Sequence, residues 1–256
     1  SESTNAIHLP LANLIPSLQK LMALTEAIQT SFNITIKCKG KILLNESLPL
    51  MLLPFNQWHG ENTMPELLAS FVTPNHPCLV PIIKRASDIL KYISGDKSLD
   101  DYQSNNYLRI LQQVKSMYES LLEENILYAT MPASFENRGQ RIRLVDDVLQ
   151  NKMGNCIELS LLLCSCLENI GLRTIVVLFQ NHVIMGVWLD PTISTPMVGY
   201  DISKLEQMLE YEVSPLLLIE SVGIAKECSF EEAVDYKIAN CPVSPEYSVL
   251  LFQMRF

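Results

Sequence analysis

The 256-residue sequence lacks the features that would place a protein in or across a membrane. No apolar run approaches the roughly 20 consecutive residues that a bilayer-spanning helix needs. The first ten residues, SESTNAIHLP, contain neither the basic start nor the apolar stretch of a secretory signal. We therefore expect no membrane span and no export signal, and we expect a cytoplasmic protein.

Positive charge is also scarce. The chain has 19 Lys and Arg against 28 Asp and Glu, for a net charge of −9. Proteins that bind DNA or RNA directly usually present clustered positive charge to the phosphates, so this balance argues against direct nucleic-acid binding. Charged residues make up only 18% of the chain, below the roughly 25% of typical soluble domains, which excludes disorder as its main character.

Cys-x-x-Cys pairs are absent, although the chain has seven cysteines and four histidines. The odd cysteine count, and the position of four cysteines inside apolar runs, favour reduced thiols over a disulfide framework. The scattered histidines give no support to a structural zinc site. We predict no metal and no cofactor, so the chemical question is whether any one thiol is more than a small buried hydrophobe.

Two parts are expected in the chain. The first, residues 1–54, is predicted to hold a helix over 11–29 and then a hairpin, in which Ile34, Ile36 and Cys38 line a half-buried strand and Lys39-Gly40 forms the turn. The second, residues 55–256, begins with a helical part over 64–125, with helices over 64–72, 78–93 and 104–125. The irregular segment 125–144 follows, and loops of this length tend to be functional.

The clearest pattern lies in the predicted core, residues 145–256. Asn155 is a favourable N-cap, Glu158 is placed to complete a capping box, and Gly171 is placed to end the helix. The residues between them are apolar on nearly all sides, which predicts a central, buried helix. Three strands are expected after it, over 173–179, 182–189 and 214–223, with short helices from 206 and over 230–239.

Cys156 occupies the first turn of that helix, where unpaired N–H groups and the helix dipole favour a thiolate. A nucleophilic cysteine also needs a base, and a third group that orients the base. His182 begins a strand that follows the helix by one strand and a turn, so the fold can bring its ring to Cys156. Glu220, at the end of the third strand, is the first choice for the acid, and Asp190 and Asp201 are the alternatives.

Each of these residues also has a purely structural interpretation. A cysteine in an apolar region more often serves packing than chemistry, as we predict for Cys164 and Cys166 in the middle of the helix. A single histidine at a strand start is usually a satisfied or surface residue, and Glu220 can equally be a rim carboxylate. Spacing alone leaves both interpretations open.

The same residues carry a resemblance to a known family. GNCIELSLLL, the Gly-terminated helix after it and VVLFQNHVIMGVWL resemble the transglutaminase-like, papain-related cysteine hydrolase superfamily. More closely, the chain resembles the transglutaminase-like module near the N-terminus of large bacterial proteins that continue into a helicase and nuclease region. Further similar segments, in the same order, are NQWHG, MPELLASFVTPN, SLDDYQS, PASFENRGQRIRL, FEEAVD and VLLFQMRF.

The resemblance implies an α+β fold, in which a helix with the nucleophilic cysteine packs on an antiparallel sheet with the histidine and the acid. A helical subdomain and a short β-rich N-terminal segment precede this core. The resemblance assigns Cys156, His182 and Glu220 as a catalytic triad and makes Gln57 a candidate oxyanion donor. Two departures are Glu220, where the superfamily has Asp, and the tripeptide Asn-His-Val over 181–183, where relatives often have Gly-His-Ala.

Two functions follow from the resemblance. The first is a cysteine hydrolase or acyltransferase that acts on an amide, either a peptide bond or a glutamine side chain of a protein or peptide substrate. The alternative is a non-catalytic module that recruits a partner to a larger helicase–nuclease protein of the defence type, with DNA contacts outside these residues. We expect the chain to be either a trimmed piece of such a protein or a short stand-alone relative.

Overall fold

A computed structural model describes residues 17–60, 63–130, 139–179, 182–193, 198–199, 207–208, 214–235 and 250–253. The chain divides into two compact units, residues 1–57 and 58–256. The sequence pattern places the boundary after residue 54, in the loop that precedes this division.

The first unit is built around a β-hairpin. Strands β1 (Ile28–Cys38) and β2 (Lys41–Leu52) pair in antiparallel fashion, and Lys39 and Gly40 form the turn with φ angles of 47° and 79°. The predicted hairpin is therefore confirmed. Cys38 is exposed rather than half-buried, because a register shift after Ile36 pairs it with Lys41 beside the turn.

The predicted N-terminal helix is wrong over its second half. Helix α1 (Leu18–Met22) ends early, and Ile28 already lies in β1, where it pairs with Leu52. Pairing with a second strand satisfies the backbone at Ile28, and this long-range contact overrides the local helical pattern. Residues 11–16 of the predicted helix lie outside the described residues.

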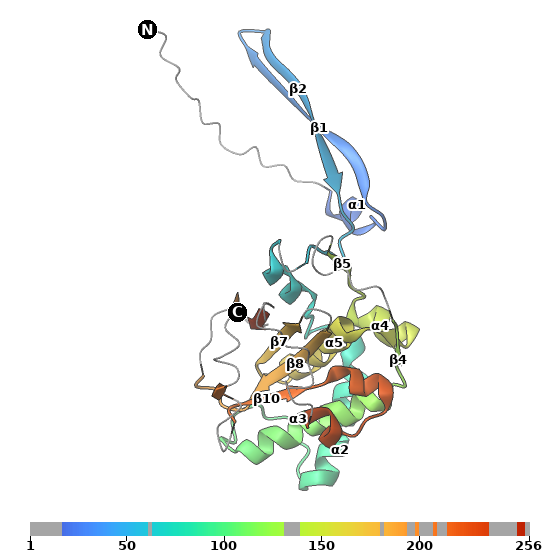
Figure 1. The fold of residues 1–256 in the computed structure, drawn as a ribbon, viewed down its shortest axis with the longest axis vertical. Coiled ribbons are helices and arrows are strands. Elements are labelled where there is room, and N and C mark those ends of the chain that lie inside the picture. The colour runs from blue at the N-terminus through green and yellow to red at the C-terminus, as the bar shows by residue number, and fades with distance from the viewer. Residues whose placement is uncertain are drawn as a thin grey trace. The chain divides into compact units, whose positions relative to one another are not determined.

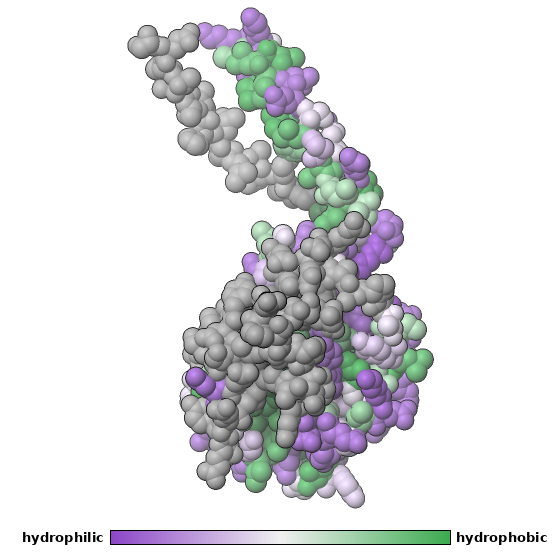
Figure 2. Space-filling model, viewed as in Figure 1, coloured by the Kyte–Doolittle hydropathy of each residue, from purple (hydrophilic) through white to green (hydrophobic). Residues whose placement is uncertain are grey.

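Apolar side chains are exposed along this hairpin, as the green surface in Figure 2 shows. The large hydrophobic residues of β1 and β2 that are more than two-fifths exposed are Ile28, Ile42, Leu43, Leu48, Leu50 and Met51. Across the part of the chain that the structure describes, no helix combines the length and the apolarity that crossing a bilayer requires.

The second unit opens with helices that pack on one another. The 3-10 helices η1 (Pro65–Phe71) and η2 (Pro77–Leu79) precede helices α2 (Val80–Ser94) and α3 (Tyr107–Leu122). The two long predicted helices are confirmed. Helix α3 begins three residues later than predicted, because the Asn106 side chain caps it by accepting hydrogen bonds from the N–H groups of Leu108 and Arg109.

A five-stranded sheet of order β10-β8-β7-β11-β9 forms the second layer. Every strand pair in it is antiparallel. Its strands are β7 (Thr174–Phe179), β8 (His182–Trp188), β9 (Val198–Gly199), β10 (Leu216–Ile219) and β11 (Leu250–Gln253). The three predicted strands correspond to β7, β8 and β10, whereas β9 and β11 had not been predicted.

The end of the third strand differs from the prediction. Strand β10 stops at Ile219, and the 3-10 helix η3 (Ser221–Lys226) replaces the rest of the predicted strand. The Glu220 side chain accepts a hydrogen bond from the N–H of Val222 and so caps η3, which ends the extended conformation. Helix α7 (Phe230–Val234) follows. Residues 207–208 are helical, and most of the helix predicted from 206 lies outside the described residues.

Helix α5 (Cys156–Asn169) packs on strands β7 and β8 (Figure 1). The capping box of Asn155 and Glu158 is present, and residues 156–168 are all buried, so the predicted central helix is confirmed. The sheet has a second apolar face on its other side, formed by Ile175, Val177, Phe179, Ile184, Trp188, Leu216 and Leu218. The fold is therefore α+β, with the sheet apolar on both faces.

Short elements connect the helical part to α5. Strand β4 (Leu127–Tyr128) pairs in parallel with β6 (Met153–Gly154), strand β5 (Gln140–Arg141) pairs with β3 (Gln57–Trp58), and helix α4 (Val145–Asn151) lies between β5 and β6. Gly139 precedes β5 with a φ of 68°, and a Cβ atom there would lie 1.9 Å from the carbonyl oxygen of Trp58. Only glycine allows this approach.

We expect Gly139→Ala to lower the free energy of unfolding by roughly 2–4 kcal/mol, measured by urea denaturation. The matched control is Gly95→Ala. Gly95 also has a positive φ, 80°, but a Cβ atom added there would have no neighbouring atom within 4 Å. The control should lose only about 1–2 kcal/mol, from backbone strain. Equal losses in the two variants would contradict the close approach to Trp58.

Candidate active site

The start of helix α5 holds Cys156 at its first residue. The Asn155 side chain accepts the Glu158 N–H at 3.1 Å, and Glu158 Oε2 accepts the Asn155 N–H at 2.9 Å. This reciprocal capping box fixes the backbone on both sides of Cys156. The thiol is 6% exposed and lies at the end of the helix where N–H groups and the dipole favour a negative charge.

Glu158 also ties the segment before α4 to this helix start. Its Oε1 accepts the Arg143 N–H at 2.9 Å, and its Oε2 accepts from Arg143 Nη1 at 2.9 Å. The Glu158 side chain is only 1% exposed, so the carboxylate is buried but well supplied with donors.

Strands β8 and β10 bring His182 and Glu220 together. The two strands are neighbours, with Ile219 opposite Met185, so the residue after β10 lies beside the N-terminal part of β8. Glu220 Oε2 contacts His182 Nε2, while Glu220 Oε1 accepts the Val222 N–H at 3.0 Å. Both carboxylate oxygens are therefore held in place.

His182 also lies close to Cys156, whose side chain and charge help to raise the pKa of His182. Because Nε2 of the ring contacts Glu220, Nδ1 is the ring nitrogen that can interact with the Cys156 sulfur. The imidazole thus lies between a thiol and a carboxylate, which is the order that a base-activated nucleophile needs. The His182 and Glu220 side chains are 22% and 13% exposed.

The electrostatics of the site favour a protonated His182. Burial lowers the pKa of His182, but hydrogen bonds with Cys156 and Glu220 and the negative charges of both groups outweigh it and raise the pKa to about 9. The imidazole therefore holds a proton at neutral pH, ready to donate to a leaving group.

Two buried serines join the acid to the cysteine helix. Ser221, next to Glu220, is 2.7 Å from Ser160 by their Oγ atoms, and its Oγ donates to the Cys156 carbonyl at 3.4 Å. Both side chains are completely buried. This link couples the position of η3, and with it Glu220, to the start of α5.

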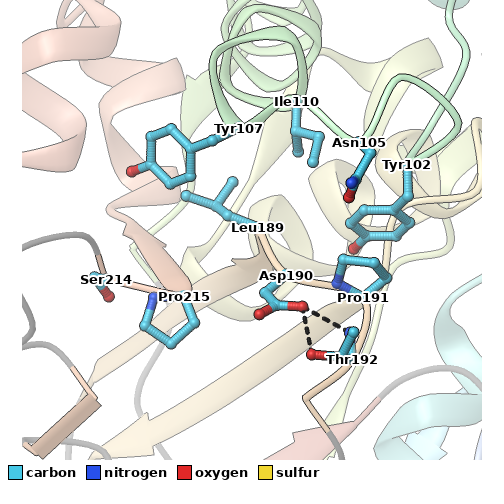
Figure 3. Close-up of a pocket in the computed structure, with 10 residues that line it drawn as sticks. All are labelled: Tyr102, Asn105, Tyr107, Ile110, Leu189, Asp190, Pro191, Thr192, Ser214 and Pro215. Atoms are coloured by element: carbon cyan, nitrogen blue, oxygen red, sulfur yellow. Dashed lines mark hydrogen bonds between the residues drawn. The ribbon is translucent and has the colours of Figure 1, made fainter.

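The alternative acid Asp190 lies elsewhere. It follows β8 at the end opposite His182, and a strand of seven extended residues is roughly 20 Å long. Asp190 Oδ1 accepts from the N–H and the hydroxyl of Thr192, which lowers the Asp190 pKa. The aspartate lines a separate cavity of about 370 Å³ (Figure 3), whose described lining includes none of Cys156, His182 and Glu220. Asp201 lies outside the described residues.

The other cysteines have different surroundings. Cys164 and Cys166 are completely buried in α5, and burial raises the pKa of both thiols. Within the described ranges, all six cysteines are free: Cys38, Cys78, Cys156, Cys164, Cys166 and Cys228. No three His, Cys, Asp or Glu side chains of those ranges are grouped to hold a metal ion.

The NQWHG segment contributes to the core. Trp58 is completely buried, and its indole N–H donates to the Pro65 carbonyl at 3.3 Å. Gln57 is the last residue of the first unit, and its role as an oxyanion donor stays a prediction.

Tyr128 is a site residue that sequence reasoning missed. Its phenol lies beside Cys156, whose charge, side chain and backbone N–H all act on the pKa of Tyr128. It lies 28 residues before the cysteine, in the segment predicted as irregular, and no motif marks it. The only available signal was that such a long loop tends to line a functional site.

Comparison with known proteins gives one distant structural neighbour to report. No family model and no curated protein matches the sequence. The crystal structure of a "putative protease" from Parabacteroides distasonis covers 77% of this chain at 13% identity, with a TM-score of 0.28. The chain spans only 40% of the length of that protein.

Proposed function

We propose that the chain is a transglutaminase-like cysteine hydrolase or acyltransferase that acts on an amide, with Cys156, His182 and Glu220 as its triad. The observation that carries the proposal is the position of His182, which contacts Glu220 and lies close enough to Cys156 for the two groups to interact electrostatically. The placement of Cys156 at the start of a buried helix supports it further, because the same N–H groups can stabilise a developing oxyanion.

In this mechanism, the Cys156 sulfur attacks the amide carbonyl carbon after its proton has passed to His182. The carbonyl π pair moves to oxygen and forms a tetrahedral intermediate. His182 then protonates the nitrogen, and the amine leaves as the carbonyl re-forms in a thioester on Cys156. Water completes hydrolysis, or a second amine completes transfer. Glu220 holds the imidazole in the orientation that permits both proton transfers.

The experiment is to follow alkylation of each cysteine by iodoacetamide at pH 7 with mass spectrometry. In the wild-type protein, Cys156 should react faster than Cys38, although Cys38 is exposed and Cys156 is buried. His182→Ala should slow alkylation at Cys156 by about 100-fold or more, since it removes the base, and should leave Cys38 unchanged.

His76→Ala is the matched control. His76 Nδ1 lies 2.9 Å from the Cys78 sulfur, so this variant should alter the rate only at Cys78. If Cys156 reacts no faster than Cys38, and His182→Ala changes nothing, the triad is not catalytic. Recruitment of a partner to a larger protein would then become the better account of the module.

A further inference from the structure

Tyr128 is brought to the site by backbone pairing. In the parallel pair of β4 and β6, Tyr128 lies opposite Gly154, two residues before Cys156. Two hydrogen bonds of 2.8 Å hold this register, from the Leu127 N–H to the Lys152 carbonyl and from the Ala129 N–H to the Gly154 carbonyl. The strand pair therefore fixes the backbone of Tyr128 close to the start of α5.

The phenol lies near both groups of Cys156 that take part in the proposed chemistry, the sulfur and the backbone N–H. Both the Cys156 side chain and the Cys156 N–H, one of the donors that α5 cannot use internally, act on the pKa of the phenol. Tyr128 is also 39% exposed, so its ring borders solvent. A tyrosine that only filled the core would be buried and would have no contact with the reacting sulfur.

We propose that Tyr128 is a further catalytic residue, whose hydroxyl donates a hydrogen bond to the oxyanion that forms when Cys156 attacks a carbonyl. This inference rests on the proposed function, because it assigns a role within the same acylation step.

The acceptor of the phenol proton changes during that step. Before attack, the hydroxyl can donate to the nearby sulfur. As the S–C bond forms, the sulfur loses its negative charge, and the carbonyl π pair becomes a full charge on oxygen. That oxygen occupies the position served by the Cys156 N–H, which places it next to the phenol. When the leaving group departs with the electrons of its own bond, the pair on oxygen returns to the carbonyl.

The phenol remains a donor throughout the neutral range. Burial, the charge of Cys156 and the hydrogen bond to its side chain raise the pKa of Tyr128 to about 12, although the backbone N–H of Cys156 opposes this. A protonated phenol can stabilise an oxyanion but cannot act as the base, which leaves that role to His182.

The test compares two electrophiles at Cys156. p-Nitrophenyl acetate acylates the thiol through an oxyanion and releases p-nitrophenolate, whereas iodoacetamide alkylates it by displacement of iodide without one. Tyr128→Phe keeps the ring and removes only the hydroxyl. We expect it to slow acylation by about 100-fold and to change alkylation by less than about threefold. Tyr92→Phe is the matched control, because Tyr92 is 93% exposed, and it should change neither rate.

Each other outcome overturns the proposal in a distinct way. Equal slowing of both reactions in Tyr128→Phe would show a positioning or packing role, and faster acylation would show that the hydroxyl blocks the site. A wild-type Cys156 that is alkylated in a His182-dependent way but never acylated would contradict a working oxyanion site while preserving the reactive triad. A Cys156 that reacts with neither probe faster than Cys38 would overturn the proposed function, and this inference with it.

Discussion

Glu158→Gln is expected to lower the free energy of unfolding by about 2–4 kcal/mol. The buried Glu158 carboxylate accepts hydrogen bonds from the Asn155 N–H, the Arg143 N–H and the Arg143 guanidinium. A glutamine amide keeps the shape of the side chain but turns one acceptor into a donor, and it removes the negative charge that pairs with the Arg143 guanidinium. Chemical denaturation with guanidinium chloride measures the loss.

A second capping box in the same chain provides the control. Glu232 accepts from the Ser229 N–H at 2.8 Å and from its hydroxyl, at the start of the short helix α7. Since Glu232 is exposed to solvent, water replaces the lost hydrogen bonds, and Glu232→Gln should change stability far less. Similar losses in the two variants would mean that Glu158 stabilises the protein only as a local helix cap. Its burial and its ion pair with Arg143 would then add nothing to stability.

Glu220→Gln is expected to lower the pKa of His182 by roughly one to two units from its wild-type value of about 9. The substitution removes the negative charge of the carboxylate that contacts His182 Nε2, while the glutamine oxygen can still accept a hydrogen bond from that nitrogen. Titration of the histidine ring protons by NMR measures the shift, and His182→Ala identifies the resonance. The control is Asp190→Asn, at the far end of β8, which should leave the pKa of His182 unchanged.

The raised pKa of His182 in the wild-type protein predicts that its stability depends on pH. A histidine in an unfolded chain has a pKa near 6.5, and in the folded protein the pKa of His182 is raised to about 9. The stabilisation from the proton is therefore complete below about pH 6.5 and is lost as the pH rises through 9. In Glu220→Gln the unfolding free energy should change less between pH 6.5 and pH 9.5. An unchanged pH profile would contradict the charge of Glu220 as a cause of the raised pKa.

Local signals in the sequence were enough to predict several elements. Helix α5 could be predicted because its N-cap, its capping box and its apolar run all lie within one short segment. The hairpin turn at Lys39-Gly40 was equally local. The N-terminal helix was wrong beyond Met22, because the pairing of Ile28 with a residue 24 positions away decided the backbone conformation there. Strand β11 pairs with β7 on one side and with β9 on the other, and no local pattern marks such partners.

For the candidate site, the sequence by itself determined that Cys156 starts a buried helix and that His182 starts a strand, since caps and apolar spacing act over a few residues. Only the tertiary structure decided which groups meet there. The register of β8 and β10 brings Glu220 to His182 and leaves Asp190 at the opposite end of β8. The parallel pairing of β4 with β6 brings Tyr128 to Cys156. Strand register is set by contacts between segments far apart in the chain, so no local pattern can contain it.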